Sequence, residues 1–177
     1  MRPILPAPDI YGYRNKMEFT VARGDAAERV VPKGRRLDGS DGQGQPAVVV
    51  GLHEADRYDA VLDVERCLLQ SDRMNALLEE ARRFFTERRL TIYDQESGEG
   101  LLRFLMLREG KRTGEAMVNV VTSAPAVSEL EPLVGRVQAR VPETSSVVLN
   151  VNPKKASVAV GVEEHLLGGR DHIREPL

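Results

Sequence analysis

The residues best suited to chemistry in this chain are a single cysteine and three widely separated histidines. Cys67 is the only cysteine, so no disulfide forms within the chain. His53, His165 and His172 lack the close spacing of metal ligands. Acidic residues occur as adjacent pairs, which places them side by side on a surface. No glycine-rich phosphate loop and no Gly-x-Ser-x-Gly turn is present in the sequence. The residues alone therefore predict a binding module and assign no catalytic group.

Cations and tyrosines near the N-terminus could contact a nucleic acid. Arg14 and Lys16 flank Asn15 at the start of a predicted strand, where residues two apart project from the same face. Both cations could therefore meet one phosphate backbone. Tyr11 and Tyr13 could stack on an unpaired base. These residues are the principal RNA-binding candidates.

Two further arginines, Arg103 and Arg108, lie on a predicted hairpin and are weaker RNA-binding candidates. The alternative interpretation is that all these cations are ordinary surface charges, or ion pairs with Glu18 and Glu109. A run of helix arginines is interpreted as a solvated face. Its members are Arg82, Arg83, Arg88 and Arg89.

Apolar–polar alternation predicts the strands that must position these residues. The expected strands are 16–23, 47–52, 60–64, 101–108, 115–122, 146–151, 156–161 and 164–167, with 91–93 as a short addition. Residues 24–46 are rich in glycine and are expected to form a flexible hairpin loop. Strand runs broken by two helices indicate an α+β fold, a mostly antiparallel β-sheet with two helices packed on one face.

Two helices are expected from capping residues and i, i+3, i+4 apolar spacing. Ser71 is the predicted N-cap of the first helix. The apolar stripe of that helix is Met74, Leu77, Leu78, Ala81 and Phe85. The second helix carries a capping-box pattern, Ser128-x-x-Glu131, and Pro132 is expected in its first turn, where no hydrogen bond is lost.

The composition is that of an ordinary globular domain. Of the 177 residues, 41% are apolar and 29% charged, and the net charge is −2. No apolar run approaches the roughly 20 residues that span a bilayer. The N-terminus does not resemble a secretory signal. We therefore expect a cytoplasmic protein without a membrane partner.

Three segments of the sequence resemble known proteins and indicate more than a binding module. Ile10–Thr20, with its Tyr-Arg-Asn-Lys core, resembles a signature of the RNA (uracil-5-)-methyltransferases, especially the branch acting on 23S rRNA. Leu102–Gly110 with Thr113–Val118 is similar to the next hairpin of that family. Asn150–Lys154 with Gly168–Ile173 is similar to the segment that precedes its methyltransferase domain.

The resemblance implies that residues 1–177 are the central domain of such an enzyme. An N-terminal RNA-binding barrel and a C-terminal S-adenosylmethionine domain would then be absent. The full-length enzyme would use S-adenosyl-L-methionine and a [4Fe-4S] cluster, with Cys67 as the fourth cluster ligand. This fragment is expected to hold neither cofactor and to be inactive alone. Its partners would be RNA, above all 23S rRNA, and the missing domains of its own chain.

The resemblance also implies the chemistry of the intact enzyme. A cysteine thiolate outside this chain would add to C6 of a flipped-out uridine, and C5 would then take the methyl group. Spacing alone favours a different role for Cys67, that of a small buried apolar residue. Two alternatives stay open, a tRNA uracil-5-methyltransferase fragment and a free-standing RNA-binding or protein-interaction module.

Overall fold

The computed structural model describes residues 8–24, 30–32, 47–156 and 158–176. They form one sheet with the strand order β2-β4-β3-β1-β5-β6-β7-β8. The strands are β1 Lys16–Gly24, β2 Val30–Pro32, β3 Ala47–Glu54, β4 Arg57–Asp63, β5 Leu102–Glu109, β6 Ala116–Thr122, β7 Thr144–Val151 and β8 Glu163–Gly169. The helices are α1 Asp72–Glu87 and α2 Val127–Arg140.

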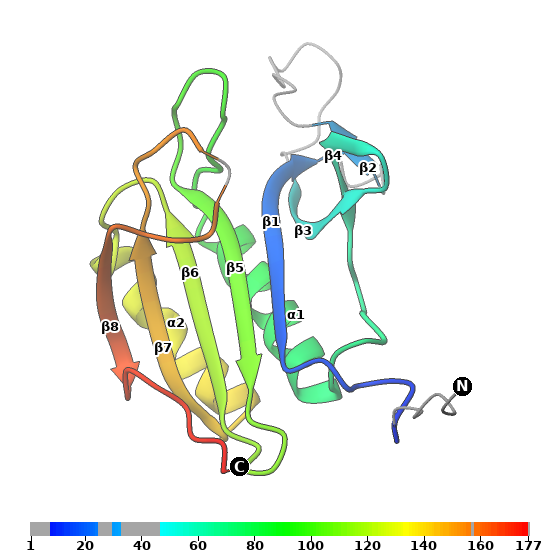
Figure 1. Ribbon diagram of the computed structural model, residues 1–177. Coiled ribbons are helices and arrows are strands. Elements are labelled where there is room, and N and C mark those ends of the chain that lie inside the picture. The colour runs from blue at the N-terminus through cyan, green and yellow to red at the C-terminus, as the bar shows by residue number, and fades with distance from the viewer. Residues whose placement is uncertain (1–7, 25–29, 33–46, 157, 177) are drawn as a thin grey trace.

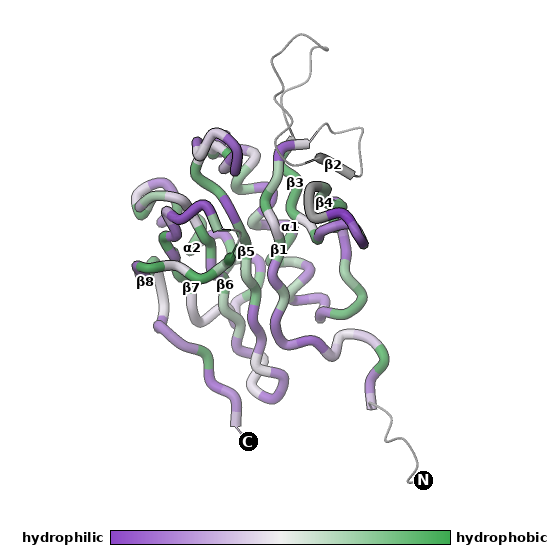
Figure 2. Tube along the Cα trace, turned by 45° about the horizontal axis from the view of Figure 1, so that its top comes forward, coloured by the Kyte–Doolittle hydropathy of each residue, from purple (hydrophilic) through white to green (hydrophobic). Residues whose placement is uncertain are grey.

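All the strand pairs are antiparallel except β6 and β7, which run parallel and are joined through α2. Figure 1 shows both helices behind the sheet. The predicted α+β class, with a mostly antiparallel sheet and two helices on one face, is confirmed. Figure 2 shows apolar stretches along the strands and a mostly hydrophilic segment after β8.

Side-chain alternation builds the core between the sheet and the helices. On β1, Met17, Phe19 and Val21 are buried toward the helices, and Leu105 and Leu107 on β5 join the same cluster. Residues of the opposite parity project from the other side of these strands. We call that side, which neither helix covers, the open face.

Helix α1 follows the sequence-based prediction closely. Ser71 is its N-cap, and the Ser71 hydroxyl accepts a hydrogen bond from the Met74 backbone N–H. The five stripe residues are all buried, and Phe84 is buried beside them. An apolar stripe that meets the core explains why this helix forms where it does.

Helix α2 begins earlier than predicted. Its N-cap is Ala126, without a side-chain cap, and Ser128 lies inside the first turn, where its hydroxyl donates to Glu129. The capping-box prediction was therefore wrong. Pro132 falls beyond the first turn, so it removes one hydrogen bond from the helix.

Two strand predictions also differ from the structure. Residues 156–161 form no strand in the described part of the chain, and Ile92 makes only an isolated bridge with Leu102. The predicted loop 24–46 is interrupted by β2, which pairs with β4 at the sheet edge. That edge position suits Pro32, which lacks a backbone donor. Residues 25–29 and 33–46 of the predicted loop lie outside the described residues.

Neither of the two described helices is long and apolar enough to cross a membrane.

Candidate RNA-binding face

Two of the predicted RNA-binding cations are direct neighbours on the open face. Lys16 on β1 and Arg108 on β5 are Cα partners in the antiparallel ladder, and both are exposed. Lys16 forms an exposed ion pair with Glu18, at 3.6 Å between Nζ and Oε2. The fold thus brings together cations that are 92 positions apart in the sequence (108 − 16).

Tyr13 and Arg14 lie just before Lys16, in a segment fixed by backbone hydrogen bonds. The Gly12 N–H donates to Leu68 O and the Arg14 N–H to Leu69 O, each at 2.8 Å. Tyr13 is 52% exposed, and Tyr11 is exposed as well. The Arg14 guanidinium contacts Met17 Sδ at 3.9 Å and is otherwise exposed. The aromatic and basic candidates therefore gather at the end of the sheet where β1 begins.

Arg103 does not belong to this group, because its guanidinium is held inside the protein. The residue is 4% exposed. Its Nη1 donates to Asn152 O at 2.5 Å and to Lys154 O at 2.6 Å, and its Nη2 donates to Ala156 O at 2.8 Å. The guanidinium also stacks over the Tyr93 ring, 4.4 Å from its centroid. Burial lowers the pKa of Arg103 from its ordinary value. The sequence-based interpretation of Arg103 as an RNA contact is corrected to a structural role.

One of the helix arginines is also not a solvated charge. Arg82 Nη2 donates to the carbonyls of Val50 and Val64, at 3.0 and 2.6 Å, and to Asp63 Oδ1 at 3.0 Å. The Arg82 side chain is 19% exposed. It ties α1 to the middle of β3 and to the end of β4, so the prediction of a solvated face was wrong for this residue.

Cys67 is buried, and its backbone is held by a side chain of α1. Asn75 Oδ1 accepts from the Cys67 N–H at 2.9 Å, and Asn75 Nδ2 donates to Cys67 O at 3.0 Å. The same amide also bonds to Gln70 Nε2 and to Ser71 O. Sequence reasoning missed Asn75, since nothing in its spacing relates it to Cys67.

The residues of this chain do not fit a [4Fe-4S] cluster. Such a cluster needs four thiolates, and Cys67 is the only cysteine. Within the described residues, no group of three histidine, cysteine or acidic side chains could hold a metal ion.

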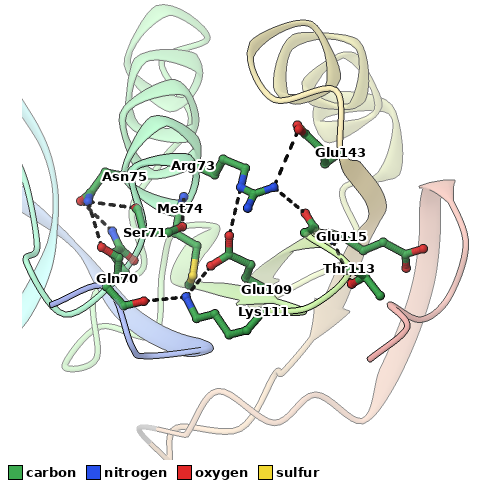
Figure 3. A network of polar contacts seen from close by, with 12 residues as sticks. Gln70, Ser71, Arg73, Met74, Asn75, Glu109, Lys111, Thr113, Glu115 and Glu143 are labelled. Atoms are coloured by element: carbon green, nitrogen blue, oxygen red, sulfur yellow. Dashed lines mark hydrogen bonds and ion pairs between the residues drawn. The ribbon is translucent and has the colours of Figure 1, made fainter. Parts of the chain in front are cut away.

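A buried carboxylate organises the end of β5 (Figure 3). Glu109 is 3% exposed and forms ion pairs with Arg73 Nε at 3.1 Å and with Lys111 Nζ at 2.6 Å. Lys111 Nζ also donates to Gly12 O at 2.8 Å. This network joins the first turn of α1 to the segment that carries Tyr13 and Arg14. Glu109 therefore pairs with Arg73 and Lys111, and not with the hairpin arginines considered from the sequence.

The chain is similar to bacterial RNA methyltransferases over its whole length. It is 36% identical over 179 residues to an uncharacterized RNA methyltransferase of Chlorobaculum tepidum, a match that covers 100% of this chain and 36% of that protein. A relative from Synechocystis sp. is 29% identical over 175 residues, covering 99% of this chain and 34% of that protein. The chain thus spans about a third of the length of these relatives. No protein-family model matches it.

A solved structure has the same fold. It is the tRNA (uracil-54, C5)-methyltransferase of Pyrococcus abyssi, in complex with S-adenosyl-L-homocysteine. The TM-score is 0.68 at 23% sequence identity, and the match covers 98% of this chain and 35% of that one. The chain is therefore homologous along its full length to about a third of an RNA methyltransferase.

Proposed function

We propose that this chain is the RNA-positioning central domain of an S-adenosylmethionine-dependent RNA (uracil-5-)-methyltransferase that forms 5-methyluridine in 23S rRNA. The observation that carries the proposal is the 36% identity to an RNA methyltransferase across the whole chain. The Tyr-Arg-Asn-Lys segment supports the uracil-5 assignment and its 23S branch by resemblance.

The geometry of the open face supports an RNA-holding role. Arg14, Lys16 and Arg108 are exposed at one end of the sheet, with Tyr13 beside them. Cations on a fixed ladder can follow a phosphate backbone, and an exposed tyrosine can stack on a base. The net charge of −2 makes this a local basic site on a slightly acidic protein.

The chain itself is proposed to perform no methyl transfer. Its one thiol, Cys67, is buried, whereas a nucleophile that attacks a base must reach it. The groups that bind S-adenosylmethionine and attack uracil would lie in other parts of the full-length protein. Any iron–sulfur cluster would need three cysteines from outside this chain, so no step here depends on it.

Nucleoside analysis tests the proposal. The 177-residue chain and its full-length parent are each incubated with S-adenosylmethionine and unmodified transcripts of 23S rRNA and of tRNA. The RNA is then digested and 5-methyluridine is measured by mass spectrometry. We expect 5-methyluridine only with the full-length protein and only in 23S rRNA. Methylation by the isolated chain would contradict the division of labour proposed here.

The incubation with tRNA transcripts tests a second candidate substrate. It is favoured by one observation, that the solved structure with the same fold is a tRNA (uracil-54, C5)-methyltransferase. Product in tRNA alone would transfer the assignment to that substrate. A parent gene without any methyltransferase segment would instead favour a free-standing RNA-binding or protein-interaction module.

A further inference from the structure

The segment that carries the candidate RNA-binding residues belongs to no helix or strand, yet its backbone is held at both ends. Residues 12–15 directly precede β1. At one end, the Gly12 N–H donates to Leu68 O, and Gly12 adopts a φ of 65°, a left-handed conformation that favours glycine. At the other end, the Asn15 carbonyl accepts from the Glu109 N–H at 2.9 Å. The exposed side chains of this segment therefore project from a fixed backbone.

Lys111 adds a contact to this segment from the turn between β5 and β6. Its ammonium group donates to Gly12 O at 2.8 Å and to the Glu109 carboxylate at 2.6 Å. Figure 3 shows Lys111 and Arg73 on different sides of that carboxylate. Glu109 thus holds the segment twice, through its backbone N–H at Asn15 and through Lys111 at Gly12.

The Glu109 carboxylate lies on the helix side of the sheet. It is 3% exposed and pairs with Arg73 of α1, whereas the preceding residue, Arg108, is exposed on the open face. A buried charge loses its hydration, and apolar residues of similar size are often at least as stabilising. The best-attested advantage of such a group is that it specifies one arrangement of the parts that it joins. Here those parts are the β5–β6 turn and the segment that carries Tyr13 and Arg14.

We infer that Lys111 is a positioning residue for RNA, held by Glu109 so that Tyr13 and Arg14 are in place before RNA binds. Lys111 and Glu109 themselves do not touch the RNA. A segment that is ordered beforehand binds more tightly, because the entropy of ordering it is not lost on binding. The inference rests on the proposed RNA-positioning function and deepens it by naming the groups that preorganise the binding segment.

A competing role for Lys111 is direct contact with a phosphate, because its side chain is 33% exposed. The two roles predict opposite effects of neutralising Glu109. If Lys111 contacts phosphate, removal of the neighbouring carboxylate strengthens RNA binding, since less negative charge remains near the RNA. If Glu109 positions Lys111, the same change loosens residues 12–15 and weakens RNA binding.

The test titrates a fluorescein-labelled, single-stranded oligouridine with the 177-residue chain at low salt and records anisotropy. We expect Glu109→Gln to weaken binding by about threefold to tenfold, the cost of ordering one side chain on binding. Glu18→Gln is the matched control. It removes an exposed carboxylate that pairs with Lys16, and it should strengthen binding. Glutamine keeps the size of glutamate, and Arg73 and Lys111 are both partly exposed to water, so the fold should be preserved.

Lys111→Met is a second test, and it also decides the matter if Glu109→Gln loses its cooperative unfolding transition. We expect weaker binding with an unchanged slope of log K against log salt, because no phosphate contact is lost. Lys155→Met is its matched control, since Lys155 Nζ also donates to a backbone carbonyl, that of Glu96, at 3.3 Å. Lys155 follows the end of β7, at the opposite end of the sheet from Gly12, so this control should leave binding nearly unchanged.

The outcomes separate the inference from the proposed function. Unchanged or tighter RNA binding by Glu109→Gln overturns the inference and leaves the proposed function intact. The same holds for Lys111→Met if its affinity is unchanged, or if its salt slope falls in magnitude by about 0.7, the value of one phosphate contact. No RNA binding by the wild type at low salt overturns both.

Discussion

Lys16 and Arg108 face each other across β1 and β5 as directly paired residues with the same charge. Like charges placed opposite each other destabilise a sheet. The ion pair of Lys16 with Glu18 offsets part of this repulsion, and an anion bound between Lys16 and Arg108 would relieve more of it.

Neutralising either cation should weaken RNA binding without weakening the fold. Three phosphate contacts, from Arg14, Lys16 and Arg108, predict a slope of about −2 for log K against log salt with single-stranded RNA. Arg108→Gln should reduce the magnitude of that slope by about 0.7 and raise the unfolding free energy by about 0.2–1 kcal/mol. Anisotropy titrations across salt and urea unfolding measure the two effects. Arg88→Gln, on the helix side, is the control and should leave the slope unchanged.

Removing the Arg103 guanidinium should destabilise the protein strongly. Arg103→Met keeps most of the side-chain volume but removes the donor to the carbonyls of Asn152, Lys154 and Ala156, of which Ala156 O still accepts from the Val158 N–H. We expect a loss of about 3 kcal/mol or more in unfolding free energy by urea denaturation. Arg108→Met, from the same strand, should not lower the unfolding free energy, because it relieves the like-charge pairing with Lys16. Equal effects of the two substitutions would contradict the structural role of Arg103.

Weakening the Asn75 clamp should expose the Cys67 thiol. Asn75→Ala removes both backbone contacts to Cys67 and should cost about 2 kcal/mol of unfolding free energy. The segment around Cys67 should then open more often, so a thiol reagent should modify Cys67 faster. Asn75→Asp keeps the acceptor for the Cys67 N–H and should give an intermediate rate. A modification rate that is the same in all three proteins would argue against the clamp.

Acid should release the C-terminal segment from the β5–β6 turn. A hydrogen bond from Arg170, and a second from the Arg174 N–H, hold the pKa of Glu115 below its ordinary value of 4.5. The ionised Glu115 carboxylate therefore stabilises the contact of the C-terminal segment with the β5–β6 turn at pH values above 4.5. This contribution is lost as the pH falls through the lowered pKa. Backbone NMR signals of residues 170–176 should therefore shift toward random-coil values below pH 4.5.

The control for acid release uses two matched substitutions. Glu115→Gln should loosen the C-terminal segment at neutral pH and remove its pH dependence. Glu131→Gln, at an exposed position of α2, should leave the transition in place. Persistence of the acid transition in Glu115→Gln would assign it to another group.

Local patterns were enough to predict most of the architecture of this protein. Alternation in β1 and the apolar stripe of α1 are properties of neighbouring residues, and burial of one face follows from them. The pairing of Lys16 with Arg108 was not predicted, because strand register between distant segments depends on how the whole sheet assembles.

The two hairpin arginines show a difference that the sequence alone could not predict and that the tertiary structure determines. Arg103 and Arg108 looked equivalent as exposed cations, yet Arg103 is 4% exposed and binds carbonyls about 50 residues away, whereas Arg108 stays in solvent. Periodicity reports which face of an element is apolar. Only the folded chain determines which distant backbone group reaches a given side chain, because that contact depends on the path of the intervening residues.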